Sequence, residues 1–137
     1  MMFSIFDIAG SGLSAQSLRL NLTASNLANS QNVAGDPQGV YSARHPVFRS
    51  REMSFASHMN GAGVEVLGIL ESSAAPIERY DPGHPQANAD GMVYAANVNP
   101  VEEMANMISA SRSYQSNLEV INTHKDLMMR TLTLGQG

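Results

Sequence analysis

The sequence predicts a mainly α fold: long N- and C-terminal helices packed as an antiparallel, coiled-coil-like pair, with a small β-rich or loop insertion between them. Two observations predict this fold. The two ends of the chain show helical apolar periodicity. All but one of the six prolines and most glycines lie between those ends. We therefore expect a discontinuous helical domain of residues 1–33 and 97–137, and an insertion of residues 34–96.

The first predicted helix runs from about residue 3 to residue 29 and has apolar residues on two faces. One stripe is Phe6, Ala9, Leu13, Leu20, Ala24 and Leu27, and the other is Ile8, Ala15, Leu18 and Leu22. The stripes lie roughly 200° apart at 100° per residue. A helix that is apolar on two faces needs neighbours on two sides, so pairing with one other helix is not enough.

The middle of the chain changes character after Ser30. Residues 39–50 and 64–70 are predicted as short strands, bounded by glycine and serine. Pro82 and Gly83 occupy the two central positions of a predicted type II turn, and His84 is expected to pack against this turn or cap it. Large apolar residues are too few here for an extensive core of the segment's own.

The last predicted helix begins at Pro100 and ends at Leu134. Asn99 suits the N-cap, proline suits the first helical position, and Glu102 and Glu103 complement the positive end of the helix dipole. Gly135 stands at the expected C-terminal stop, and Asp126 and Arg130 form an expected i,i+4 pair. Apolar residues recur at heptad-like spacing at Met104, Met107, Tyr114, Leu118, Ile121, Met128 and Leu132. This spacing favours packing against another helix.

Composition excludes several classes of protein. A net charge of −4, with only 15% charged residues, offers no basic face for nucleic acid. No apolar run is long enough to span a membrane. The start of the sequence lacks the basic region and apolar stretch of a cleaved signal peptide, so the cytoplasm is the default, with export lacking a cleaved peptide left open. The chain has no cysteine, hence no disulfide or thiolate.

No catalytic, cofactor-binding or metal-binding residue is predicted. The histidines His45, His58, His84 and His124 lack the spacing that would put two imidazoles on one metal. Glu102 and Glu103 diverge on a helix and cannot face each other as acid and base. The Gly10-Ser11-Gly12 cluster lacks a P-loop lysine, so a close helix–helix contact explains it better.

The stretch ASNLANSQNVAG, residues 24–35, ends the first helix in polar residues. Asn26 and Asn29 lie one turn apart beside Leu27. Their amides can bond exposed carbonyls or the backbone of a neighbour and so fix register at a joint between subunits. Simple fraying of the helix end is the alternative.

Three stretches together resemble a known family: ASNLAN (24–29), YDPGHPQANADGMVYAANVN (80–99) and EMANMISASRSYQSNLEVINTHKDLMMRTLTLG (103–135). They resemble the flagellar basal-body rod proteins of bacteria, and in particular the proximal rod proteins, over the whole chain. The motif residues are Asn26, Asn29, Asn97 and Asn99. Two stretches depart from the family pattern: GMV at 91–93 with AANVN at 95–99, and QANAD at 86–90.

The resemblance implies a structural subunit of the rod, the drive shaft in the periplasm, and no enzyme. Such proteins polymerise with themselves and other rod proteins, and their terminal helices form the wall of the export channel. They pass unfolded through the flagellar type III apparatus without a cleaved signal, and the proximal ones connect toward the inner-membrane ring and export gate. Whether the insertion also meets surrounding ring proteins stays open.

Two other hypotheses are weighed beside the rod subunit. One is a soluble coiled-coil adaptor or secretion-linked regulator that binds one partner through its helices. The other is a small hydrolase with a site in the insertion. Under the rod hypothesis the subunit interface comprises Phe6, Leu13, Leu18, Leu20, Leu22, Leu27, Met104, Met107, Tyr114, Leu118, Ile121, Met128 and Leu132.

Overall fold

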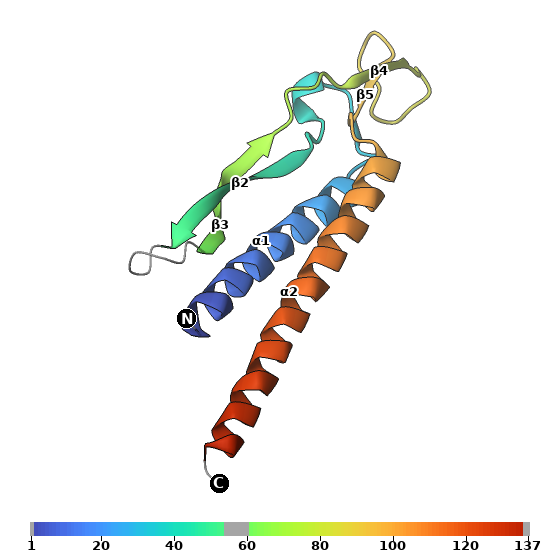
Figure 1. The fold of residues 1–137 in the computed structure, drawn as a ribbon. Helices are drawn as coiled ribbons and strands as arrows, with labels where there is room; N and C mark the ends of the chain where they lie inside the picture. The colour runs from blue at the N-terminus through green and yellow to red at the C-terminus, as the bar shows by residue number, and fades with distance from the viewer. Residues whose placement is uncertain (1, 54–60, 136–137) are drawn as a thin grey trace.

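Two long helices lie at the ends of the chain and run side by side in opposite directions (Figure 1). The computed structural model describes residues 2–53 and 61–135. Helix α1 spans Met2–Ala28 and α2 spans Pro100–Leu134. Asn99 caps α2: its side chain accepts a hydrogen bond from the Val101 backbone, and Pro100 follows it as the first helical residue, as the sequence predicts.

The middle of the chain forms two antiparallel sheets. Strands β2 (Arg44–Met53) and β3 (Gly61–Glu71) pair as a two-stranded sheet, with a register shift between Val47 and Phe48. Strands β1 (Val33–Ala34), β5 (Met92–Ala95) and β4 (Ile77–Tyr80) form a second sheet in that order. A short 3₁₀ helix, η1, spans Pro37–Gly39.

The predicted, mainly α fold class is therefore wrong: the middle of the chain is a multi-strand antiparallel region and not a small loop insertion. Strands hold 24% of the described residues against 51% in helices, so the fold is α and β together. The prediction assumed that residues 34–96 need a core of their own. The β2–β3 hairpin instead packs along α1 (Figure 1). Contact with this helix stabilises the strands, so the middle segment does not need a separate core.

The hairpin supplies the second neighbour that the two apolar stripes of α1 require. Helix α2 lies on one side of α1 and the hairpin on another, so α1 has two neighbours from its own chain (Figure 1). Ser11 fixes the hairpin: its hydroxyl accepts a hydrogen bond from Val64 N at 2.9 Å and donates one to Ile8 O at 2.7 Å. Gly61 lies so close to Ile8 that a Cβ atom there would be 2.6 Å from Ile8 Cδ1.

A small apolar core lies where α1 ends and α2 begins. Val40, Ala43, Ala96 and Val98 are buried in it, with Ala34, Tyr41 and Tyr94 packed against them. Within the helix pair the buried apolar side chains are small: Ala9, Ala15 and Ala110. The larger leucines and methionines are therefore less completely covered.

The turn at Pro82-Gly83 exists but is not of type II. His84 N donates to Asp81 O at 3.1 Å, which closes a four-residue turn. A type II turn needs a positive φ at its third residue. Among the described glycines the positive φ belongs to Gly91, at 74°, and not to Gly83. His84 does cap the loop, since its Nδ1 accepts from Gln86 N.

Candidate subunit interface

Asn26 is the centre of a buried hydrogen-bond network that joins three parts of the chain. Its side chain is 1% exposed. Its Oδ1 accepts from Arg44 N at 2.9 Å and from the Tyr41 hydroxyl at 2.8 Å. Its Nδ2 donates to Arg44 O at 2.9 Å and to Glu103 Oε2 at 3.1 Å. The amide therefore ties the end of α1 to the start of β2 and to the first turns of α2.

The structure thus places Asn26 inside the subunit, where all four of its hydrogen bonds are used. Glu103 has a role that the sequence did not indicate: besides lying near the positive end of α2, it is buried and accepts a bond from Asn26. Tyr41 was also missed. Its hydroxyl lies 3.1 Å from Ser25 Oγ as well as bonding Asn26.

The other motif asparagines hold turns and ends of elements. Asn29 Nδ2 donates at 2.8 Å to Ser25 O, a carbonyl in the last turn of α1 that also accepts a hydrogen bond from Asn29 N. Asn97 Nδ2 donates to Ala75 O at 3.0 Å, and Asn99 caps α2. These three contacts lie within one chain. The four motif asparagines therefore mainly stabilise the junction between the helices and the sheets.

The two helices approach each other closely at Gly12. A Cβ atom at this position would lie 2.9 Å from Asn117 Nδ2. Gly10 has open space around it. Nearer the start of α1, the rings of Phe6 and His124 meet edge to face with centroids 6.4 Å apart. The predicted helix–helix contact at the glycine cluster is therefore confirmed, but for Gly12 alone.

None of the predicted interface residues is buried within the chain. Phe6, Leu13, Leu18, Leu20, Leu22, Leu27, Met107, Tyr114, Ile121 and Met128 are partly covered, and Met104, Leu118 and Leu132 are exposed. Further large apolar side chains on α2 are also exposed, among them Ile108, Leu127, Met129 and Leu134. An apolar surface of this extent is typical of a site for protein–protein contact.

The far end of α2 has the greatest apolar exposure. Phe6 lies level with His124, so the last turns of α2 extend past the beginning of α1 (Figure 1). Leu132 is 61% exposed and Leu134 is 83% exposed. This overhang has no cover from the described part of its own chain.

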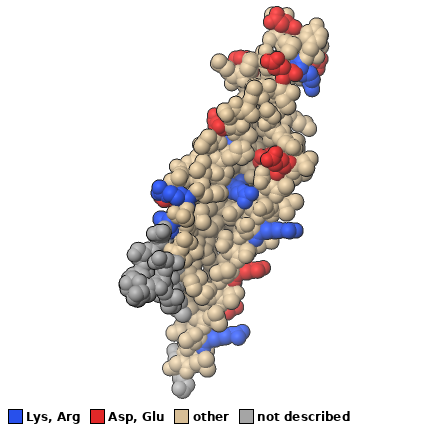
Figure 2. All heavy atoms as spheres, turned by 45° about the horizontal axis from the view of Figure 1, so that its top comes forward, with Lys and Arg blue, Asp and Glu red and all other residues tan. Residues whose placement is uncertain are grey.

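Charge is sparse and scattered on the face shown in Figure 2. The ion pairs within the described residues are Arg44–Glu71 at 2.9 Å, Arg49–Glu65 at 2.7 Å and Arg79–Asp81 at 3.5 Å. The expected Asp126–Arg130 pair is not among them. The hydrogen bond from Arg49 lowers the pKa of the Glu65 carboxyl below its ordinary value.

In the part of the chain that the structure describes, no three histidine or carboxylate side chains gather to hold a metal ion. His58 lies outside that part. No helix within residues 2–53 and 61–135 is long and apolar enough to cross a membrane. The described feature suited to binding another protein is the exposed apolar surface of the two helices.

Known proteins resemble this chain over nearly its whole length. Residues 6–35 match the family model described as flagella basal body rod protein, and residues 89–134 match that of the flagellar basal body rod FlgEFG protein C-terminal region. The flagellar basal-body rod protein FlgC of Salmonella typhimurium is 50% identical over 135 residues, which cover 98% of each chain. The FlgC proteins of Yersinia enterocolitica and Buchnera aphidicola (strain APS) are 48% and 40% identical with the same coverage.

Proposed function

The chain belongs to the family of flagellar basal-body rod proteins and is a structural subunit of the basal-body rod, and we propose that it builds the proximal rod by packing its terminal helices against neighbouring subunits. The rod proteins are structural and not enzymes. The chain-length match to rod proteins leaves no observation in favour of an adaptor or a hydrolase.

One observation carries the proposal: the large apolar side chains in the stripes of both helices stay partly or fully exposed in the single chain. Burying a leucine-sized side chain contributes about 1.5–3 kcal/mol, so a surface with this many exposed apolar side chains gains stability when a neighbour covers it. In this proposal residues 1–33 and 97–137 act as the rod-core domain. Residues 34–96 shape its outer side.

The position within the flagellum is part of the same proposal. The subunit lies in the periplasmic rod, contacts copies of itself and other rod proteins, and connects toward the inner-membrane ring and the export gate. It is exported by the flagellar type III apparatus without cleavage of a signal peptide. The mass of the subunit taken from purified basal bodies tests this last point, because cleavage would shorten it.

Two substitutions test the packing proposal. Leu20→Asp or Leu118→Asp places an unpaired carboxylate in the proposed interface, where burial without a partner costs several kcal/mol. We expect either variant to be synthesised and soluble but to form no rods, counted by electron microscopy of basal bodies. Asn122→Asp is the matched control, because it adds the same charge at an exposed polar position of α2. Normal swimming by both leucine variants would overturn the proposal.

A further inference from the structure

A pocket of about 300 Å³ opens where three elements of the subunit meet. It lies between α1, the start of β2 and the first half of α2. Its lining residues are Arg19, Thr23, His45, Pro46, Phe48 and Asn106. The pocket is separate from the Asn26 network, which uses none of these side chains.

Arg19 gives this pocket its charge. It is the only cation in α1, and Asp7 is the only other charged residue of that helix. The guanidinium is partly buried and donates one hydrogen bond, from Nη2 to Asn106 Oδ1 at 3.2 Å. Within the described residues no carboxylate lies within 4 Å of it. A partly desolvated guanidinium with free donors in a fork geometry suits a carboxylate.

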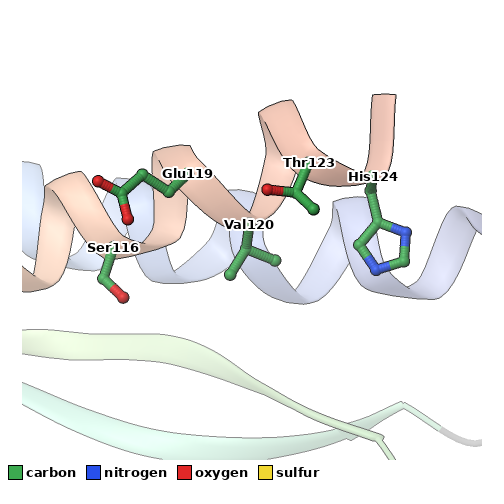
Figure 3. Close-up of a pocket in the computed structure, with 5 residues that line it drawn as sticks. All are labelled: Ser116, Glu119, Val120, Thr123 and His124. Carbon is green, nitrogen blue, oxygen red and sulfur yellow. The ribbon is translucent and has the colours of Figure 1, made fainter. Parts of the chain in front are cut away.

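Helix α2 carries a carboxylate, that of Glu119, which has no cation partner in the described structure. Glu119 is exposed and borders a second open pocket, of about 330 Å³, with Ser116 and Thr123 (Figure 3). The residues one turn away on either side of it are uncharged. In the described structure no cation lies within 4 Å of it. Asp126 likewise forms no ion pair in the described structure, but it has Lys125 beside it and Arg130 one turn later in the sequence.

Glu119 cannot reach the Arg19 pocket of its own chain. It lies about 20 Å further along α2 than Asn106, which marks the level of Arg19. Building on the proposed rod assembly, we propose that the Arg19 pocket of one subunit binds the Glu119 carboxylate of a second copy. Pocket and carboxylate lie about 20 Å apart along one subunit, and we place the contact head-to-tail because such a contact extends from copy to copy, as a helical array requires.

A charge-reversal experiment tests the pair, because every copy supplies both partners. Arg19→Glu or Glu119→Arg alone juxtaposes like charges and should lower the number of assembled rods by at least about tenfold. The double variant restores attraction with reversed sign and should recover assembly. Combining Arg19→Glu with Asp126→Arg is the control and should not recover it. A double variant no better than the single variants would overturn the proposal, provided that circular dichroism shows each variant folded.

Crosslinking identifies the partner directly. The chain contains no cysteine, so Arg19→Cys with Glu119→Cys introduces the only thiols. Mild oxidation of intact basal bodies should yield disulfide-linked multimers of this chain. A chain carrying Arg19→Cys and Asp126→Cys should yield none. A photo-crosslinker at position 19 that captures a different rod protein would overturn the second-copy assignment. If the Arg19–Glu119 tests fail while Leu118→Asp still abolishes rods, the pair is wrong but helix packing stands.

Discussion

The buried side chain of Asn26 permits a quantitative prediction for Asn26→Ala. This change removes four hydrogen bonds and leaves Arg44 N, Arg44 O and the Glu103 carboxylate without their partner, while Tyr41 keeps Ser25. A neutral hydrogen bond contributes about 1 kcal/mol net and a bond to a charged group about 1.5–3 kcal/mol. We therefore expect a loss of about 3–5 kcal/mol in the free energy of unfolding, from a total of about 10 kcal/mol for a chain of this length.

Urea unfolding of the purified subunit, followed by circular dichroism, measures this loss. With an m-value of about 2 kcal/mol/M, the midpoint for Asn26→Ala falls by about 2 M. Asn29→Ala is the matched control: it lies one turn away in the same motif and removes one hydrogen bond, to Ser25 O, so about 1 kcal/mol is expected.

Asn26→Asp separates hydrogen bonding from shape. The new carboxylate keeps the size of the side chain but loses both donors and faces the Glu103 carboxylate. It should destabilise at neutral pH at least as much as alanine, and acidification should restore part of the loss because the protonated carboxyl group again offers a donor. Equal midpoints for Asn26→Ala and Asn29→Ala would refute the reasoning, since they would show that the network contributes no more than the single hydrogen bond of Asn29.

Three further predictions concern other parts of the chain. Gly10→Ala should stabilise α1 by up to about 1 kcal/mol, because its surroundings are open, whereas Gly12→Ala should gain less because Asn117 must move; comparison of the two thermal midpoints checks this. Limited proteolysis should remove the chain ends of the free subunit, the end of α2 first, and spare them in assembled rods; equal resistance in the two states would contradict the proposal that neighbouring subunits cover these ends. The Arg49 guanidinium lowers the pKa of the Glu65 carboxyl below its ordinary value, so the pair makes a small contribution to stability that is present at neutral pH and is lost as the pH falls through the lowered pKa. Both side chains are solvent-accessible, so Glu65→Gln should leave the thermal midpoint at neutral pH within experimental error.

Local signals in the sequence are sufficient to predict the two helices. The asparagine N-cap, the proline after it and the acidic first turn of α2 act over a few neighbouring residues, and they predict its first residue correctly. The absence of proline before Ser30 likewise predicts α1. The family follows from motifs of the same local kind.

The extent of the sheets could not be predicted in this way. Arg44–Met53 contains proline and several charged residues, so its sequence does not show a clear alternation of apolar and polar side chains. Its strand is stabilised by pairing with β3 and by packing on α1, both of which depend on residues distant in the sequence. The sequence therefore underestimates how much of the middle segment forms β-strands.

The surroundings of Asn26 were beyond prediction for the same reason. Its partners Tyr41, Arg44 and Glu103 lie 15, 18 and 77 positions away. An asparagine near a helix end has the same local sequence whether it caps that helix or binds a distant strand. The predicted interface residues remain a prediction, supported by their exposure in the single chain.

The enclosure of α1 between α2 and the hairpin has a genetic consequence. A harmful change on the enclosed faces of α1 disturbs contacts within one polypeptide, so mutations that restore motility should fall in the same gene. A harmful change on the outer face of α2 disturbs contacts with whatever lies beside it, and suppressors that fall in a second gene would identify that neighbour. A collection of motile revertants would therefore distinguish folding residues from assembly residues, position by position.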